Sequence, residues 1–257
     1  MRPAFARILL LSVAIALSSA AQAAEWATLK GRLIYDGTPP EPIKLEVNKD
    51  RYAFGSLGLT YERLVVGADR GLANVLVYIR TPNVDVHPDY EKHKTDNILL
   101  ETRDGRFNPH IVLLRTTQNL QLENADSVAH SANFRMIANT PQNLLVLPGT
   151  STVLRFPHEE RLPCNVWDNI HSWMDGRIVV RENPYMTVTD SAGRFTLKDV
   201  PAGSELEFQL WHERAGYLKD LPFTGGKTDV KGRFTLTLKP GETDLGEMKV
   251  PPSAVQK

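Results

Sequence analysis

The chain has 257 residues, and 30 Lys and Arg balance 30 Asp and Glu, so its formal net charge is zero. Because there is no net field and no basic cluster with interleaved aromatic residues, binding to nucleic acid is not expected. The sequence also contains no glycine-rich phosphate loop and no Gly-x-Ser-x-Gly elbow. It therefore lacks the common signatures of nucleotide-binding proteins and of serine hydrolases.

Residues 1–23 have the pattern of a secretory signal peptide. Arg2 and Arg7 form a basic start, an apolar run follows, and Ala21-Gln22-Ala23 is a small-residue cleavage site. The apolar run is short for a membrane span, and no other stretch of the chain comes close. We therefore expect a periplasmic or secreted protein with no membrane span after signal cleavage.

The rest of the chain predicts an all-β protein. Short alternating or β-branched runs recur between turn signals, as is typical of sandwiches and barrels. In chain order these runs are residues 27–37, 74–80, 110–124, 150–156, 176–182, 186–190, 193–200, 205–211 and 232–238. Residues 89–97 are the best helical candidate, but an exposed loop or a single turn fits them better.

The most informative segment is the one from Leu162 to Gly176, which holds the only cysteine of the chain, Cys164, together with His171 and Met174. A lone cysteine in an oxidising compartment cannot form an internal disulfide, so it is a free thiol, a crosslink to a partner or a metal ligand. A thiolate, an imidazole and a thioether together suit copper better than calcium, magnesium or structural zinc. His130 lies upstream, at the end of an expected strand.

One upstream histidine followed by a Cys/His/Met loop before the last strand resembles the ligand order of a cupredoxin. Residues 98–182 are accordingly expected to form a cupredoxin-like Greek-key β-sandwich. Residues 183–257 have the cadence of a transthyretin-like or carboxypeptidase-regulatory-like β-sandwich that lacks its opening strands. The segment 24–97 would supply those strands, with the cupredoxin-like unit inserted between the two parts or packed closely against them.

The chain resembles exported cupredoxin-like proteins labelled methylamine-utilisation proteins, which combine these two kinds of sandwich. The matching motifs are Asp36-Gly37-x-Pro39-Pro40, Gly71-Leu72-Ala73-Asn74-Val75, Phe107-x-Pro109-His110, Asn124-x-Asp126, His171-x-Trp173-Met174, Asn183-Pro184-Tyr185, Val200-Pro201-Ala202-Gly203 and Trp211-His212-Glu213. The resemblance implies a mononuclear copper site with His130, Cys164, His171 and Met174 as ligands.

This sequence departs from the family at the copper loop. Related proteins read Cys-x-x-His-Pro-Trp-Met, but here Asp168 stands three residues before His171, Ser172 replaces the proline, and Cys164 lies four residues further upstream. A dinuclear centre with two bridging thiolates is excluded, because the chain has one cysteine.

Several ligands therefore have alternatives. Asp168 is either an oxygen ligand, as in a red or type 2 copper centre, or a carboxylate that accepts backbone hydrogen bonds in a turn. Cys164 is either the thiolate ligand or a small buried apolar residue. Met174 is either a weak axial ligand or a core residue. His110 is a further candidate imidazole ligand, or it ends a strand.

These features predict a periplasmic copper-binding protein for electron transfer or copper handling, with an unidentified redox partner. The alternative is a metal-free cupredoxin scaffold that acts as an interaction module. A copper enzyme in which Asp168 assists proton transfer is a third possibility. The sequence contains no paired acid and base to support turnover, so no catalytic residue is assigned.

Overall fold

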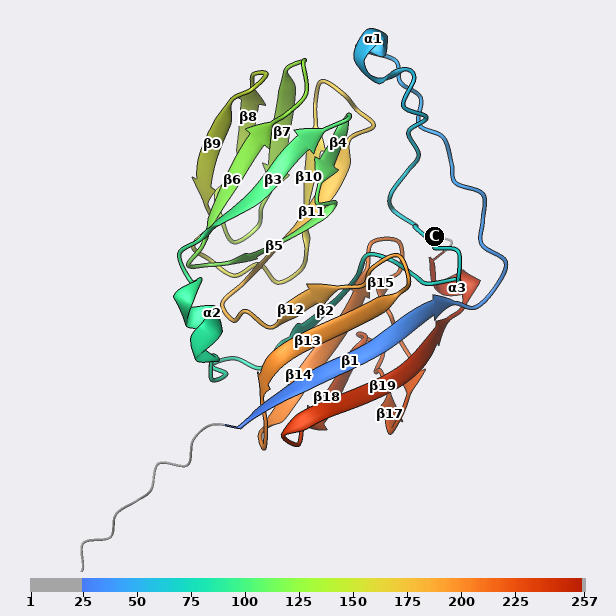
Figure 1. Ribbon diagram of the computed structural model, residues 1–257, viewed down its shortest axis with the longest axis vertical. Coiled ribbons are helices and arrows are strands. Elements are labelled where there is room, and N and C mark those ends of the chain that lie inside the picture. The colour runs from blue at the N-terminus through green and yellow to red at the C-terminus, as the bar shows by residue number, and fades with distance from the viewer. Residues whose placement is uncertain (1–24, 256–257) are drawn as a thin grey trace, which may run out of the picture.

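The computed structural model describes residues 25–255, so the expected signal peptide lies outside the described residues. Almost all of the regular secondary structure in the described chain is β-strand, which confirms the all-β prediction. Its helices are short, namely α1 (Arg51–Phe54), α2 (Pro88–Lys92) and α3 (Pro252–Val255). Over residues 25–255 no helix has the length and apolar character needed to cross a membrane. Figure 1 shows two sandwiches, with strands β3 to β11 above and the remaining strands below.

The upper sandwich contains two sheets that enclose one apolar core. The first sheet has the order β4 (Arg106–Asn108), β3 (Asn97–Arg103), β6 (Asn119–Asn124), β9 (Ser151–Arg155). The second has the order β5 (Ile111–Arg115), β11 (Asp175–Arg181), β10 (Cys164–Asp168), β7 (His130–Arg135), β8 (Gln142–Val146). Buried and half-buried residues alternate along β6, so that Leu120 and Leu122 face Phe134 and Ile178 in the core.

The lower sandwich combines strands from both ends of the chain. One sheet has the order β13 (Arg194–Pro201), β1 (Trp26–Tyr35), β19 (Gly241–Val250). The other has the order β12 (Met186–Val188), β2 (Val75–Ile79), β14 (Glu205–His212), β15 (Gly216–Tyr217), and β18 (Arg233–Thr237) pairs with β14. A hairpin of β16 (Pro222–Phe223) and β17 (Gly226–Lys227) completes it. The upper sandwich is thus inserted between β2 and β12 of the lower one.

An apolar cluster joins the two sandwiches. Its buried members are Leu76, Tyr78, Ile111, Val179 and Trp211, contributed by β2 and β14 below and by β5 and β11 above. The Arg181 guanidinium lies 4.9 Å from the centre of the Tyr78 ring and donates a hydrogen bond to the Ile79 carbonyl. Burial of this cluster favours a fixed arrangement of the two units.

A long segment between β1 and β2 leaves the lower sandwich and reaches the top of the upper one. Figure 1 shows this segment rising beside the two units to α1 and returning. We call residues 38–62 the arm. Its two limbs are joined by hydrogen bonds from Leu45 N to Leu59 O and from Tyr61 N to Ile43 O. Phe54 and Leu59 belong to the core of the upper sandwich, so the arm covers one of its ends.

His212 is a buried titratable group in β14. Its side chain is inaccessible to solvent, its Nδ1 accepts from Arg214 N, and its Nε2 has no hydrogen-bond partner among the described residues. Burial lowers the pKa of His212 to about 4. A histidine in the unfolded chain binds its proton below pH about 6.5.

Between pH 6.5 and 4 the unfolded state therefore binds more protons at this position than the folded state, so stability falls as the pH falls. The loss reaches about 3 kcal/mol at pH 4, since one pKa unit corresponds to about 1.4 kcal/mol. We expect His212→Asn, which keeps an acceptor but cannot titrate, to flatten the pH dependence of the unfolding free energy in urea titrations. The matched control is His158→Asn at an exposed position. Equal slopes in both variants would contradict the assignment.

Candidate metal centre

The pairing of two central strands creates a polar group at the top of the upper sandwich. His130 begins β7, Asp168 ends the antiparallel strand β10, and Asp168 is opposite Ala132 in the register. The loop that follows β10 carries His171 and is closed by hydrogen bonds from Met174 N to His171 O and from Asp168 N to Met174 O. These three polar side chains therefore reach the same end of one sheet.

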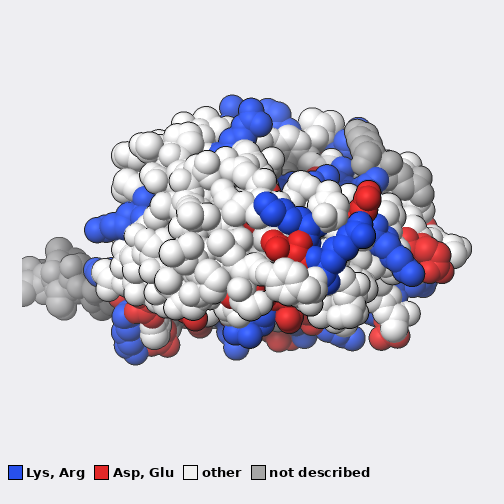
Figure 2. Space-filling model, turned by 90° about the horizontal axis from the view of Figure 1, so that it is seen from above, with Lys and Arg blue, Asp and Glu red and all other residues white. Residues whose placement is uncertain are grey.

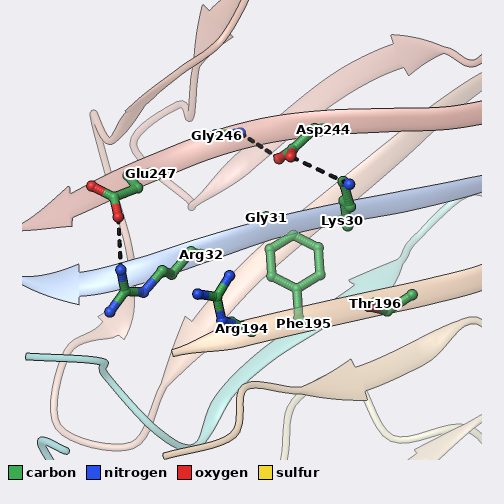
Figure 3. Close-up of a pocket in the computed structure, with 9 residues that line it drawn as sticks. All are labelled: Lys30, Gly31, Arg32, Arg194, Phe195, Thr196, Asp244, Gly246 and Glu247. Atoms are coloured by element: carbon green, nitrogen blue, oxygen red, sulfur yellow. Dashed lines mark hydrogen bonds and ion pairs between the residues drawn. The ribbon is translucent and has the colours of Figure 1, made fainter. Parts of the chain in front are cut away.

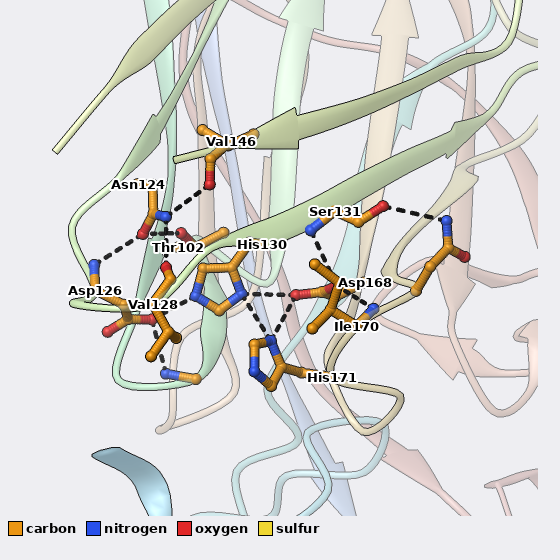
Figure 4. A network of polar contacts seen from close by, with 12 residues as sticks. Thr102, Asn124, Asp126, Val128, His130, Ser131, Val146, Asp168, Ile170 and His171 are labelled. Carbon is orange, nitrogen blue, oxygen red and sulfur yellow. Dashed lines mark hydrogen bonds and ion pairs between the residues drawn. The ribbon is translucent and has the colours of Figure 1, made fainter. Parts of the chain in front are cut away.

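Three atoms that can bind a metal lie close together, one each from His130, Asp168 and His171, as Figure 4 shows. Oδ2 of Asp168 lies 2.6 Å from His130 Nδ1 and 3.0 Å from His171 Nδ1. The two Nδ1 atoms are 3.2 Å apart. All three side chains have 0% exposure, so the group is closed to solvent. Two imidazole nitrogens and one carboxylate oxygen in this arrangement form a potential metal site.

A second carboxylate contacts the outer nitrogen of each histidine. His130 Nε2 lies 3.0 Å from Asp126 Oδ2, and His171 Nε2 lies 2.8 Å from Asp50 Oδ2. A carboxylate partner keeps the proton on Nε2 and leaves the Nδ1 lone pair directed at the centre. This pairing of each ligand histidine with an outer carboxylate is the usual arrangement around protein-bound metals.

Asp168 uses its two oxygens for different purposes. Oδ1 accepts hydrogen bonds from Ser131 N at 3.0 Å and from Ile170 N at 2.7 Å, while Oδ2 faces the two imidazoles. The carboxylate is thus both a turn acceptor and part of the polar group. Its orientation is fixed by the backbone, because both amides belong to the segments that carry the histidines.

The loop before His130 is held by its own hydrogen bonds. The Asn124 amide donates to the carbonyls of Val128 and Val146, and its Oδ1 accepts from Asp126 N. The Asp126 carboxylate accepts in turn from the amides of residues 104 and 105, in the turn between β3 and β4. Asp126 is therefore in place for His130 whether or not an ion is bound.

Hydrogen bonds outweigh burial in setting the charges of the group. Burial alone would raise the pKa of Asp168, but hydrogen bonds from His130, His171 and the amides hold it well below its usual range. Burial opposes protonation of His130, and its hydrogen bonds to Asp126 and Asp168 raise its pKa above the ordinary value. The carboxylates are therefore anionic at neutral pH and attract a cation to the centre.

Aromatic rings enclose the polar group. The ring centre of Phe54 lies 5.3 Å from that of His171 in an edge-on arrangement and 6.1 Å from that of His130. The ring of Trp173 lies 5.1 Å from His171, and its Nε1 donates to the Gly105 carbonyl. These rings exclude water, which strengthens electrostatic interactions at the centre.

The structure separates Cys164 from this group. Cys164 and Asp168 stand at opposite ends of β10, about 13 Å apart at the usual strand rise. The thiol is buried in the core, and its Sγ lies 3.6 Å from the Leu162 carbonyl. Burial and the neighbouring Glu160 raise its pKa to about 12. The expected thiolate ligand is thus a protonated core residue, and the carboxylate of Asp168 occupies the position beside the histidines.

The other two candidates have different environments. His110 Nε2 lies 2.7 Å from Glu213 Oε2, and this pair connects the two sandwiches outside the polar group. Met174 is buried in the core of the upper sandwich, and its role as an axial ligand stays a prediction.

Two contributors to the site were not among the expected site residues. Asp126 lies four residues before His130, and its place in the Asn-x-Asp motif was a usable signal. Asp50 gives no such signal, because it comes from the arm, far from either histidine in sequence.

The surface has a hollow on the lower sandwich. Figure 3 shows this hollow, of about 240 Å³, on the sheet β13-β1-β19, where Lys30 pairs with Asp244 and Arg32 with Glu247. Figure 2 looks down onto the top of the molecule, and the surface over the upper sandwich, at the left of this view, carries few charged side chains.

Comparison with known proteins gives partial likenesses. No known protein family matches the chain, and no curated protein is similar to it. A copper-containing nitrite reductase from Thermus scotoductus SA-01 matches 34% of this chain and 22% of its own, with 16% identity and a TM-score of 0.31. Amicyanin from Paracoccus versutus matches 41% of this chain and 97% of its own, with 11% identity and a TM-score of 0.30. A purple cupredoxin from Nitrosopumilus maritimus matches 33% and 98%, with 18% identity and a TM-score of 0.27.

The environment of Cys164 makes a prediction about its reactivity. A thiol with a pKa of about 12 holds on the order of a thousandfold less thiolate at pH 8 than an ordinary cysteine. We expect the native protein to react with a thiol-specific disulfide reagent only at the rate at which it unfolds, and the urea-unfolded chain to react at once. Added copper should leave the native rate unchanged. Rapid labelling that copper blocks would instead place the thiolate at the metal.

Proposed function

We propose that the protein binds one copper ion through His130 Nδ1, His171 Nδ1 and Asp168 Oδ2, in a mononuclear centre of the type 2 kind. One observation carries the proposal. With protons on the outer nitrogens, all three inner atoms are acceptors, and they lie within 3.2 Å of one another in a dry site. Three acceptor atoms at such distances repel one another, and a cation between them attracts all three.

The size of the triangle supports a small transition-metal ion. Bonds of about 2.0 to 2.1 Å in tetrahedral geometry separate the ligand atoms by about 3.3 Å. The distances of 3.0 Å from Asp168 to His171 and 3.2 Å between the histidines are close to that value. The 2.6 Å distance between Asp168 and His130 is shorter, and the pair would separate slightly around an ion.

The donor set favours copper in its oxidised form. Divalent copper binds nitrogen and oxygen ligands more tightly than the other first-row divalent metals. A carboxylate in place of a thiolate is a harder ligand, which stabilises Cu(II) over Cu(I). Copper handling is therefore the role we favour over rapid electron transfer.

The cellular setting of this proposal comes from the sequence. The signal peptide expected at residues 1–23 supports export, so the ion would be acquired in the periplasm or outside the cell. Electron transfer is the other form of the proposal. It requires a redox partner, which is unidentified, and the resemblance to methylamine-utilisation proteins supports this form.

A metal-free interaction module is the second candidate, and a specific observation favours it. Close polar contacts run from Asp126 through His130, Asp168 and His171 to Asp50. Each of these contacts is a hydrogen bond if a single proton occupies the centre. The two candidates differ in whether the centre takes up a metal ion.

Metal analysis combined with visible and EPR spectra tests the proposal. The protein supplied with copper should hold about one ion per chain and show only weak d–d bands, since no sulfur is bound. Cys164→Ser should keep this spectrum, and Asp168→Ala should lose the ion. An intense sulfur-to-copper band that disappears in Cys164→Ser would refute the ligand set. Absence of stoichiometric copper would favour the metal-free module.

Asp126 should influence metal affinity although it does not face the ion. Its carboxylate orients His130, and loss of such partners typically weakens metal binding 10- to 100-fold. We expect Asp126→Asn, which keeps an acceptor oxygen but removes the charge, to weaken copper binding about tenfold in a chelator competition. Asp104→Asn, in the neighbouring turn between β3 and β4 and with an exposed side chain, is the matched control. Identical affinities for both variants would refute this role.

A further inference from the structure

Asp50 departs from the usual role of aspartate at the start of a helix. It is the N-cap residue of α1, yet its side chain makes no capping hydrogen bond. Its backbone has φ 46°, a left-handed conformation that other aspartates of the chain also adopt. The carboxylate instead reaches His171 Nε2 at 2.8 Å, across 121 positions of sequence. A contact with His171 thus replaces the local cap of α1.

Phe54, at the other end of α1, fits closely over the same group. Its side chain is buried, and its ring packs against His130, His171 and Trp173. Below it lies Gly105, where an added Cβ would come within 3.1 Å of the Phe54 ring. The arm and the turn between β3 and β4 are therefore complementary in shape.

The polar group is closed to solvent. The side chains of His130, Asp168 and His171 have 0% exposure, so a hydrated cation cannot reach the three inner atoms in this conformation. Loading and release both require some segment to move. Strands β7 and β10 are poor candidates, because each is hydrogen-bonded to a neighbour on both sides.

Few backbone hydrogen bonds hold the arm. Two of them join its limbs, and these two bonds form the isolated bridge between Lys44 and Thr60. Arg106 ties it to the upper sandwich by donating to the Thr60 carbonyl and by pairing with Glu62. Segments with few backbone hydrogen bonds open locally at the lowest free-energy cost.

We propose that the arm, residues 38–62, is a cover that controls exchange of the metal ion, with Asp50 as its latch on His171 and Phe54 as its seal. This inference rests on the proposed copper site. In the closed state Asp50 orients His171 toward the ion, and the ion enters or leaves only when the latch and the seal lift together. Asp50 is thus a positioning residue supplied by a segment outside the sandwich that holds the ligands.

The release rate of copper tests the cover. The Cu(II)-loaded protein is mixed with excess EDTA, and the loss of its copper spectrum is followed by stopped flow. For the unmodified protein we expect a rate that does not depend on EDTA concentration, because opening of the arm limits it. Phe54→Ala should accelerate release at least about tenfold. Tyr52→Ala is the matched control, since Tyr52 lies in the same turn and is 80% exposed.

A cover differs from an ordinary stabilising contact in its effect on binding. Phe54→Ala should accelerate uptake of free Cu(II) as well as release, so that the equilibrium affinity changes much less than either rate. Asp50→Ala should accelerate release and also weaken affinity, since Asp50 orients a ligand, and Asp50→Asn, which keeps an acceptor oxygen without the charge, should weaken affinity less, by about tenfold as expected for Asp126→Asn. Circular dichroism and thermal unfolding establish that each variant is folded.

The outcomes separate this inference from the copper proposal. If copper binds and Phe54→Ala and Asp50→Ala release it within twofold of the unmodified rate, the cover is refuted and the copper site stands. If Phe54→Ala accelerates release alone and affinity falls in proportion, Phe54 stabilises the site without gating it, and the cover is refuted. If the unmodified protein binds no stoichiometric copper, the copper site is refuted and the cover with it.

Discussion

Three atoms that can accept hydrogen bonds lie close together in a site closed to water, and the surrounding structure holds them there. His130 Nδ1, His171 Nδ1 and Asp168 Oδ2 lie within 3.2 Å of one another. When each histidine carries a single proton, on its outer nitrogen, none of the three atoms has a hydrogen to donate, so a proton or a metal ion between them stabilises the group. Everything nearby fixes these atoms in position.

The fold provides this position by simple means. Antiparallel pairing of β7 and β10 places the start of one strand beside the end of the other, and the loop into β11 returns His171 to the same point. Backbone amides orient Asp168, and Asp126 orients His130 from the preceding loop. The remaining orienting group, Asp50, comes from the arm between the first two strands of the lower sandwich. Insertion of one sandwich into the other thus brings the two histidines, Asp168 and the arm together.

Sequence patterns predicted the strands well because short alternating runs and turn residues are local signals. Strands β3 to β11 span residues 97–181, and residues 98–182 were expected to form one unit, a division into domains that stays a prediction. The opening strands were expected to join the C-terminal sandwich, and β1 pairs with β13 and β19. The role of the segment from Asp168 through His171 to Met174 as a metal-binding loop also stays a prediction.

The candidate site was less predictable, for physical reasons. Cys164 and Asp168 lie on the same face of β10, so alternation cannot distinguish them, and only the position of the strand ends shows which one meets the histidines. His110 was attractive as an imidazole near the same end, but its partner Glu213 lies in the other sandwich. Asp50 depends on a tertiary contact that no local pattern encodes.

X-ray absorption at the copper edge, recorded on the copper-loaded protein, identifies the atoms bound to the ion. If His130, Asp168 and His171 are the ligands, the nearest scatterers are nitrogen and oxygen only, at about 2.0 Å, with the outer scattering of two imidazole rings. A sulfur scatterer at the short distance of a thiolate, about 2.2 to 2.3 Å, would contradict this ligand set, because Cys164 could then reach the ion only if β10 and its loop were arranged differently.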